Sequence, residues 1–542
     1  MRTASCIAAL VVADLPVHCP KPLVAGEWVF HLGPLSEKRT SCGHQNPDKA
    51  DAQPEKSIVN PVAQIKVGLH SPATVKVLER NGTYAAAPVV SELNKVADAW
   101  TMIYDEGFEF NVDGYSFFTF SGFDWVTPPG GGAKTNVSRC DETQVGWYHD
   151  QDRTKFGCFY GVKTTKIPPP AIKPKVALLE MSETATRITS DHQREIVQRI
   201  NSRSRKSWVA REYPKYNGKT YKELSQMAGI PRTRLPVHRQ QRVSMLARCS
   251  SKRRSVRKDT VLGNMVLNAT EEEVAPCPTT ADAAAEDAHL RAVESAMPKD
   301  FTWASNHGNW LEPVMDQGDC GSCYAVSTMR MLSARHKIAQ NNTSLKPWSI
   351  TFPLMCNEYN QGCNGGYGFL MSKWTQDVGL VPADCARYST TGKCQVSCDM
   401  AKEGKRFRAS QHRYIGGFYG NATVAEMMTE VHARGPVVVS FEPSSDFMYY
   451  SGGVFDSGAT PMPKEWQQVD HAVLLVGWGE EAGQKYWLVQ NSWGTDWGEN
   501  GYFRIARGGN DSGIESQPEA AEVIEDERDV LTSFLEGRVH LA

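Results

Sequence analysis

The chain has 542 residues, with 59 Lys and Arg against 61 Asp and Glu, and a formal net charge of −2. Apolar residues make up 41% and charged residues 22%. This composition is typical of a soluble globular protein, and the length suggests about two to four domains. The near-zero net charge excludes a general attraction to nucleic acid or to membrane surfaces.

A short hydrophobic run, Ala4 to Ala13, follows Arg2 near the start of the chain. It is far shorter than the ~20 residues needed to span a bilayer. We interpret residues 1–13 as a signal peptide whose cleavage makes Asp14 the new N-terminus. A buried first strand is the alternative interpretation. Together with 14 cysteines, the leader predicts an oxidising secretory route, ending in a lysosome, a lysosome-like vacuole or granule, or secretion.

Residues 14–165 are rich in aromatic residues and read as short strands separated by Gly, Asp and Asn, as in tight hairpins. They predict an all-β antiparallel domain, closed as a barrel or packed as a sandwich. On pattern alone this domain could be a binding module. The predicted strands are Glu27 to His31, Thr74 to Leu78, Trp100 to Tyr104, Glu109 to Val112, Tyr115 to Phe120 and Phe156 to Gly161.

Residues 166–296 have a different character. Prolines from Pro168 onward mark a linker, a basic helical segment is predicted from Ile196 to Met227, and Arg239 to Lys258 is strongly basic. A basic block can contact nucleic acid, but no base-stacking or groove-reading motif accompanies this one. We predict a removable pro-segment with protease-sensitive basic pairs, and a solvated linker is the plainer alternative.

Residues 297–515 read as a second globular domain, and residues 516–542 as an acidic, weakly structured tail with a short helix from Val530 to Leu535. In the second domain, Gln317-Gly-Asp-Cys-Gly-Ser-Cys-Tyr324 precedes a helix predicted over Ala325 to Ala339. Cys323 therefore lies at a helix N-terminus, where free N–H groups favour a thiolate and lower the thiol pKa. Gln317 can donate a side-chain N–H to a developing oxyanion.

Two β-branched runs follow, one from Val469 to Gly477 and one from Tyr486 to Asn491, with a polar turn between them. They predict a β-hairpin. Folding it near residue 481 brings His471 roughly opposite Asn491. An imidazole oriented by an amide is the partner that a cysteine nucleophile requires.

Four ordered motifs carry a resemblance to a known family. Gln317 to Cys323, Gly362-Cys-Asn-Gly-Gly366, Asp470-His471-Ala and Asn491-Ser-Trp-Gly-x-x-Trp-Gly-x-x-Gly-Tyr502 resemble the papain family of cysteine peptidases. Within that family, Tyr324 and Tyr414-Ile-Gly-Gly-Phe-Tyr-Gly420 are similar to the cathepsin C (dipeptidyl peptidase I) type. Asp14-x-Pro-x-x-Cys19 resembles the start of its exclusion domain, and Ile200 to Trp208 resembles its propeptide.

The resemblance implies an α+β fold: a papain-like two-lobed peptidase, with a helical lobe and a β-barrel lobe, preceded by an antiparallel β-barrel exclusion domain. It implies the following roles: nucleophile Cys323, acid/base His471, imidazole anchor Asn491, oxyanion donor Gln317, backbone partner of the substrate Gly366, and Trp493 as cover of the His–Asn bond.

The cysteines of the barrel are even in number, which suits two disulfides. The pairings themselves come from the resemblance. It implies Cys19–Cys140 and Cys42–Cys158 in the barrel, and Cys320–Cys363, Cys356–Cys394 and Cys385–Cys398 in the peptidase. Cys249 and Cys277 stay unassigned.

The resemblance also implies that the Asp14 carboxylate binds the free amine of the substrate and blocks the cleft beyond two residues. A chloride would bind Tyr388 and Tyr419, with Ile514 near the pocket floor, and the assembly would be a tetramer. The chain departs from the family pattern at Ala386, where a Phe is usual, which puts chloride affinity in doubt. It departs again at Asp470, where an Asn is usual, and we expect this to tune the pH dependence.

These observations predict the zymogen of a cysteine exopeptidase that removes dipeptides from free N-termini of peptides and proteins, after processing by activating proteases. Chloride is the one cofactor expected, with no metal or organic group. A papain-like endopeptidase with a regulatory barrel is the first alternative. A catalytically inert secreted scaffold is the second.

Overall fold

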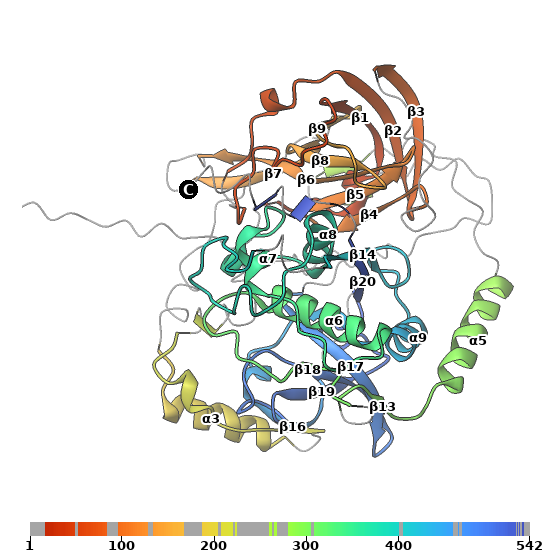
Figure 1. Cartoon of the computed structure of the whole chain (residues 1–542). Helices are drawn as coiled ribbons and strands as arrows, with labels where there is room; N and C mark the ends of the chain where they lie inside the picture. Colours follow the sequence, from red (N-terminus) through yellow and green to blue (C-terminus); the bar gives the residue numbers. More distant parts are fainter. Residues whose placement is uncertain are drawn as a thin grey trace, which may run out of the picture.

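The computed structural model describes residues 17–48, 52–83, 96–127, 134–166, 187–203, 207–220, 223–224, 260–262, 265–267, 280–304, 308–399, 405–458, 464, 469–526, 528, 530–531 and 534–535. The predicted signal peptide, Asp14, Cys249, Cys277 and the basic stretch from Arg239 to Lys258 lie outside these residues. Two globular bodies make up the described chain, one above the other in Figure 1.

The first body is a nine-stranded antiparallel barrel, drawn in red to orange in Figure 1. The strand order is β3-β2-β1-β9-β7-β6-β5-β4, and β8 pairs with both β6 and β9. The two ends of this order meet where the Trp100 N–H donates to the Ala73 carbonyl at 2.9 Å, which limits the exposed edge. The elements are α1 (Lys21–Val24), β1 (Gly26–Leu32), η1 (Lys56–Val59), β2 (Ala63–His70), β3 (Thr74–Gly82), β4 (Ala99–Ile103), β5 (Gly107–Val112), β6 (Tyr115–Val126), β7 (Thr135–Thr143), β8 (Gly146–Asp150) and β9 (Phe156–Lys163).

Alternating aromatic residues fill the barrel. Phe30 stacks on Phe110 with ring centroids 4.7 Å apart, and Phe110 stacks on Phe117 at 4.5 Å. The side chains of alternate residues share one face of a strand, so these rings build a continuous core. Every strand predicted in this region is present. Three further strands, β2, β7 and β8, were not predicted.

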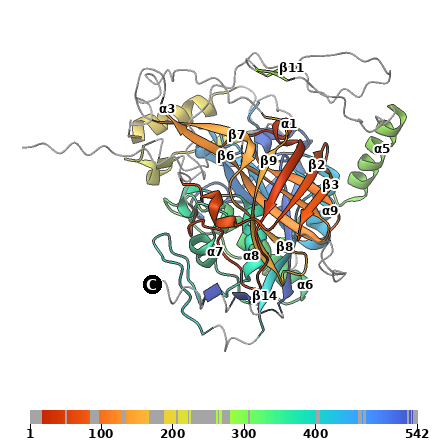
Figure 2. The same ribbon diagram turned by 90° about the horizontal axis from the view of Figure 1, so that it is seen from above.

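The second body has a helical lobe and a sheet lobe (Figures 1 and 2). Its sheet runs in the order β10-β16-β19-β18-β17-β15-β20-β14, and β13 pairs with β17. The long helix α6 crosses this sheet against β15, β17 and β20. The elements are β13 (Phe301–Thr302), α6 (Cys323–Ala339), α7 (Thr351–Cys356), η3 (Gly362–Asn364), α8 (Gly368–Val378), β14 (Phe407–Tyr414), α9 (Val424–Arg434), β15 (Val437–Phe441), η4 (Phe447–Tyr449), β16 (Tyr450–Phe455), β17 (His471–Glu481), β18 (Gln484–Gln490), β19 (Tyr502–Ala506), η6 (Asp511–Gly513) and β20 (Glu519–Glu525).

The prediction of an unstructured tail from residue 516 is wrong for its first ten residues. β20 lies inside the sheet, hydrogen-bonded to β14 on one side and to β15 on the other. Ala520 and Ala521 are buried. The many Glu residues suggested solvent exposure, but Arg335 pairs with Glu522 and so keeps that strand in the fold.

The pro-segment contributes separate small elements to the described chain. They are α3 (Ser190–Asn201), β10 (Trp208–Ala210), η2 (Pro214–Tyr216), β11 (Thr260–Leu262), β12 (Met265–Leu267) and α5 (Thr280–Ala296). The predicted long helix from Ile196 to Met227 is therefore wrong over residues 207–220, which form a strand, a 3-10 turn and loops, and part of its remainder lies outside the described residues. Trp208 instead belongs to a strand that pairs with β16 and packs on Phe455. Hydrophobic spacing alone did not reveal the break.

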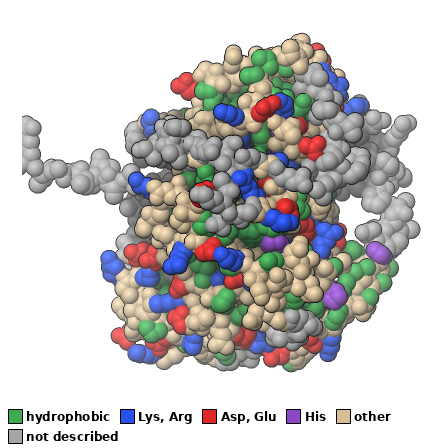
Figure 3. Space-filling model, viewed as in Figure 1, with side chains coloured by type: hydrophobic (Ala, Val, Ile, Leu, Met, Phe, Trp, Pro, Cys, Tyr) green, Lys and Arg blue, Asp and Glu red, His purple; other side chains and the backbone are tan. Residues whose placement is uncertain are grey.

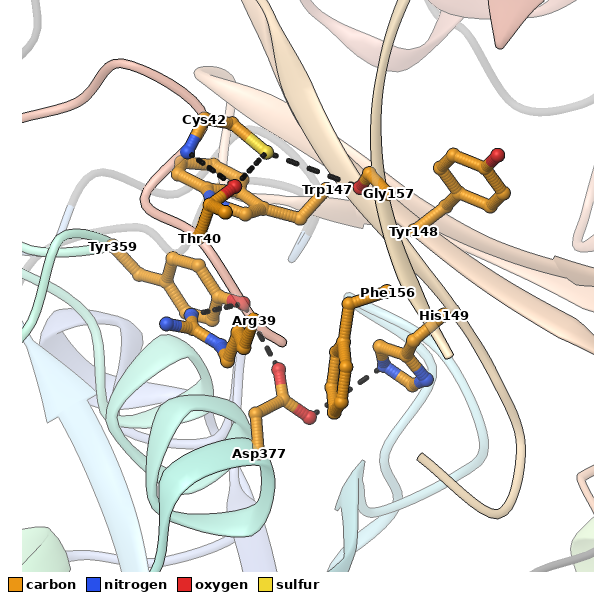
Figure 4. A pocket seen from close by; sticks show the side chains of 10 residues that line it. All are labelled: Arg39, Thr40, Cys42, Trp147, Tyr148, His149, Phe156, Gly157, Tyr359 and Asp377. Carbon is orange, nitrogen blue, oxygen red and sulfur yellow. Dashed lines mark hydrogen bonds and ion pairs between the residues drawn. The ribbon is translucent and has the colours of Figure 1, made fainter. Parts of the chain in front are cut away.

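Buried ion pairs hold the barrel against α8 of the second body, and Figure 4 shows His149 of the barrel pointing toward Asp377 on α8. Asp377 on α8 accepts from the Arg153 Nε of the barrel at 2.9 Å and from the Tyr359 hydroxyl at 2.9 Å. Arg39 of the barrel pairs with Glu358. All of these charged side chains are nearly inaccessible to water, so each depends on its partner for compensation.

A second group of the same contact centres on Glu109 of β5. Its carboxylate lies 3.0 Å from His412 Nε2 and 3.5 Å from Lys373 Nζ, both on the second body. Burial alone would raise the Glu109 pKa, but these two cations lower it to about 2. Burial also lowers the pKa of the barrel His149, beside Asp377, to about 3.

Both shifts predict that acid weakens the docked chain. Between pH 4.5 and about 2 the unfolded Glu109 binds a proton that the folded form does not, so its stabilisation is lost as pH falls through this range. His149 acts in the same direction between pH 6.5 and about 3. Urea unfolding midpoints at several pH values measure the effect. Glu109→Gln should reduce the pH dependence below 4.5, whereas the exposed control Glu195→Gln on α3 should not. Identical slopes in Glu109→Gln and the parent would contradict it.

Among the described residues, no helix combines the length and the hydropathy needed to cross a membrane. The face seen in Figure 3 carries acidic and basic side chains interspersed over both bodies, in keeping with the net charge of −2.

Candidate active site

Cys323 is the first residue of α6, following Ser322 at the N-cap. It is 3% exposed, and among the described cysteines it is the one outside a disulfide. The backbone N–H groups of Ala472 and Tyr324 favour the charged form of its sulfur and so act to lower its pKa. The predicted placement at a helix N-terminus is therefore present, with an N–H from β17 added to it.

The predicted lowering of the thiol pKa is wrong in this structure. Burial raises the pKa of Cys323 to about 11, and the negative charge of Asp470 adds to the rise. The backbone N–H groups oppose this shift without overcoming it. Desolvation thus outweighs the helix terminus, and the buried sulfur is a neutral thiol.

His471 opens β17 and is fully buried. Its Nε2 lies 2.8 Å from Asn491 Oδ1, an oxygen that also accepts the Ser492 backbone N–H. Since Oδ1 can only accept, Nε2 carries the proton and Nδ1 is the free acceptor of the neutral ring. Within the described residues, Nδ1 has no hydrogen-bond partner. Burial lowers the His471 pKa to about 4, which keeps the ring neutral.

The predicted hairpin is present and His471 meets Asn491, although the strands fold about residues 482–483 rather than 481. The turn is Ala482-Gly483, and a bulge between Leu475 and Gly477 shifts the register by one residue. Trp493 stacks on the imidazole with ring centroids 4.7 Å apart and planes at 22°. This indole shields one face of the ring from water.

Gln317 is fully buried beside the nucleophile. Its Oε1 accepts from Ser492 Oγ at 2.5 Å, and one N–H of its amide donates to the Cys320 carbonyl at 2.9 Å. The backbone N–H of Gln317 also donates to the Ser492 carbonyl at 2.9 Å. The loop before Cys323 and the loop after Asn491 are thereby tied together, and the amide retains a second N–H.

A small cleft joins these groups. Gly366 lies in its wall with φ +157°, and an added Cβ would lie 2.3 Å from Asn360 Oδ1, so a side chain is excluded there. Ser440 on β15 and Gln517 just before β20 contribute polar atoms. The lining residues are Cys323, Gly366, Tyr367, Ser440, Val469, Asp470, His471, Ala472 and Gln517.

The sequence analysis did not predict Gln517 as a site residue. In this part of the chain it predicted Ile514, near the floor of the pocket. Ile514 is fully buried in the core of the sheet lobe, and Gln517, three residues later, reaches the cleft. Ile514 directly follows η6, a tight turn in which Asn510 and Ser512 both have positive φ, and Gln517 lies in the short segment between this turn and β20. A polar residue just ahead of a buried strand was the signal that could have pointed to it.

The two tyrosines predicted to bind chloride have other contacts. Tyr388 donates its hydroxyl proton to the Gln317 carbonyl at 3.0 Å and lies 2.8 Å from Ser322 Oγ. Tyr419 packs against Tyr104 and Tyr414 in a different core cluster. With its one proton engaged, Tyr388 does not fit a chloride in this arrangement. No step of the chemistry below uses one.

All five predicted disulfide pairings are present. Each has an S–S distance between 2.00 and 2.06 Å. Cys320–Cys363 joins the loop before the nucleophile to the loop that carries Gly366. The pairs are Cys19–Cys140, Cys42–Cys158, Cys320–Cys363, Cys356–Cys394 and Cys385–Cys398.

Family models match both bodies. The model for papain family cysteine proteases matches residues 297–522, and the model for the cathepsin C exclusion domain matches residues 14–163. The first match extends past the predicted boundary at residue 515 and includes most of β20.

Individual proteins of similar sequence agree with these two family matches. Cathepsin C of Schistosoma mansoni is 28% identical over 519 residues, which cover 93% of this chain and 94% of that protein. Cathepsin B-like CP2 of Giardia intestinalis is 33% identical, covering 41% of this chain and 73% of its own length. Dipeptidyl aminopeptidase 1 of Plasmodium falciparum (isolate 3D7) is 31% identical, covering 41% and 44%. The chain thus belongs to the papain family of cysteine peptidases and carries an exclusion domain of the cathepsin C type.

Proposed function

We propose that the protein is a cysteine-type dipeptidyl peptidase, made as a zymogen, that removes dipeptides from the free N-termini of peptides and proteins. The peptidase class follows from the family. The restriction to dipeptides is the part that needs argument, because papain-family peptidases also include enzymes that cut within chains.

The path of the barrel's N-terminal segment carries the proposal. The Cys19 N–H donates to the Asp105 carbonyl at 2.6 Å, so this segment runs beside the turn between β4 and β5. Tyr104 in that turn packs against Tyr367, with ring centroids 5.7 Å apart, and Tyr367 lines the cleft with Cys323. Asp14 is three residues ahead of Val17 and so within about 10 Å of it.

A carboxylate held there would set the length of peptide that fits between it and the nucleophile. The charged amine of a substrate would pair with Asp14, and a longer chain would meet the barrel. The distance between Asp14 and Cys323 would then admit two residues, which makes the barrel a specificity device.

The chemistry follows from the buried groups. The Cys323 thiol passes its proton to His471 Nδ1, and the sulfur attacks the carbonyl carbon of the scissile bond. The oxyanion accepts hydrogen bonds from the second N–H of Gln317 and from the backbone N–H of Cys323. His471 returns the proton to the leaving amine, and a thioester remains. Water, deprotonated by Nδ1, then releases the dipeptide and restores the thiol.

The described pro-segment supports the zymogen part of the proposal. Lys215 donates to the Trp493 carbonyl and lies 3.1 Å from Asp496. Lys219 pairs with Asp319, four residues before the nucleophile. Basic pro-segment side chains therefore bind acidic loops on both sides of the site, and activating proteases would have to remove them.

The remaining assignments are proposals from the family alone: assembly as a homotetramer, and residence in a lysosome-like compartment or secretion.

Pairing of Asp14 with the substrate's amine predicts that cleavage requires a free N-terminus. A fluorogenic dipeptide amide should be cleaved at least about 100-fold faster than its N-acetylated form, because acetylation removes the charge that Asp14 pairs with. Asp14→Ala should lose most of this preference and gain activity on N-acetylated peptides. Equal kcat/KM for both substrates in the parent enzyme would favour an endopeptidase with a regulatory barrel.

A further inference from the structure

We propose that Gln517 makes the cleft select peptides whose N-terminal residue has a polar, uncharged side chain able to hydrogen-bond with the Gln517 amide. This deepens the proposed dipeptidyl function and rests on it. The residue whose carbonyl is attacked lies over Cys323. The residue before it is the one whose side chain reaches the wall formed by Gly366, Val469 and Gln517.

Gln517 is buried yet polar at the cleft wall. It is 1% exposed, and its Oε1 has no hydrogen-bond partner within the described residues. A buried amide oxygen without a partner is unfavourable, and most such groups in folded proteins are paired. A substrate donor that enters the cleft would pair it, so the unmet hydrogen bond becomes a source of selectivity.

The layer beneath Gln517 is polar as well. Glu519, the first residue of β20, has a buried Oε2 without a partner in the described chain, as does Thr328 Oγ1 on α6. A Cβ built on Gly368 would lie 2.2 Å from the first oxygen and 2.9 Å from the second, so the two are at most 5.1 Å apart. Burial raises the pKa of Glu519 well above its usual range, so its carboxyl is a neutral group.

The other residues of the cleft wall limit the size of a bound side chain but offer few hydrogen-bonding groups. Val469 and Ala472 are apolar, and Ser440 adds one hydroxyl on β15. An apolar substrate side chain would cover the Gln517 amide without forming a hydrogen bond to its oxygen. A site built to hydrogen-bond a substrate group discriminates against the analogue that lacks it far more than an apolar pocket discriminates by size. Thr should therefore be preferred over Val, and Asn over Leu, at the N-terminal position.

The test compares four dipeptide amides that share their second residue and begin with Thr, Val, Asn or Leu. In the parent, kcat/KM should be about tenfold higher for Thr than for Val and for Asn than for Leu, mainly through KM. In Gln517→Met, which keeps length and loses the amide, both ratios should fall to about one. Gln340→Met, at the exposed far end of α6, should behave as the parent.

Gln517→Glu keeps an acceptor oxygen and should retain the preference for Thr, which separates hydrogen bonding from packing. Dissociation constants of the four free dipeptides report the same pocket without turnover. Equal Thr-to-Val ratios in the parent and in Gln517→Met overturn the proposal. The same four substrates in N-acetylated form test the other premise. Their cleavage at equal rates would refute the dipeptidyl restriction while leaving the Gln517 ratios readable.

Discussion

Replacement of Cys323 by alanine is expected to lower peptide-bond cleavage by at least about 10⁴-fold. The sulfur is the atom that forms the thioester, and the described chain offers no other cysteine outside a disulfide. The thiol makes no disulfide and its side chain is small, so the variant should keep its fold. Active-site kinetics measure the loss, and the thermal unfolding midpoint confirms that the protein remains folded.

His471→Ala should cause a loss of similar size, and the double variant should be little worse than either single one, because the two groups act as a unit. An epoxide thiol inhibitor should label the matured parent at Cys323 and leave Cys323→Ala unlabelled. Cleavage by Cys323→Ala at more than about one hundredth of the parent rate would exclude this cysteine as the nucleophile. Failure of the inhibitor to label the parent would favour an inert scaffold.

Replacement of Asp377 by alanine should release the barrel from the peptidase. The carboxylate pairs with Arg153 and accepts from Tyr359, and its side chain is 1% exposed. Removing one partner of a buried pair leaves an uncompensated charge and typically costs about 3–5 kcal/mol. Chemical denaturation should show this loss, and the freed cleft should cleave N-acetylated substrates faster than the parent does.

Asp384→Ala is the matched control, since its carboxylate pairs with Lys346 at the surface and its loss should change little. Asp377→Asn keeps the shape and removes the charge, so it should be intermediate. An Asp377→Ala protein with the stability and substrate range of the parent would show that the barrel is held by its apolar contacts alone.

The sequence predicted the catalytic geometry better than the electrostatics. The hairpin prediction placed His471 within about two residues of the right partner, because two strands joined by a short turn leave little freedom in register; the turn at residues 482–483 and the bulge at Leu475 account for the offset. The prediction of a lowered Cys323 pKa was wrong because the burial of this thiol depends on strands that lie far along the chain. The local sequence at the helix terminus carries no information about those strands.

The same dependence on residues far apart in the chain explains the other features that the sequence did not predict. β7 is polar along much of its length, and its place between β9 and β6 comes from pairing with neighbours that its own pattern does not reveal. The contact between Asp377 and Arg153 joins residues 224 apart, and neither residue has a distinctive sequence context. Gln517 was missed because it lies in an irregular segment between η6 and β20, where no hydrophobic period indicates which side chains face the cleft.

The position of β20 inside the sheet has a consequence for biosynthesis. Domains generally fold as they leave the ribosome, N-terminal first, so the barrel can form while the peptidase is still being made. The peptidase sheet, in contrast, has a gap between β14 and β15 until residues 519–525 have been translated. Gln517, which lines the cleft, is translated just ahead of that strand. A nascent chain that already carries the nucleophile therefore lacks a finished substrate site, and proteolytic competence is deferred until β20 has been translated.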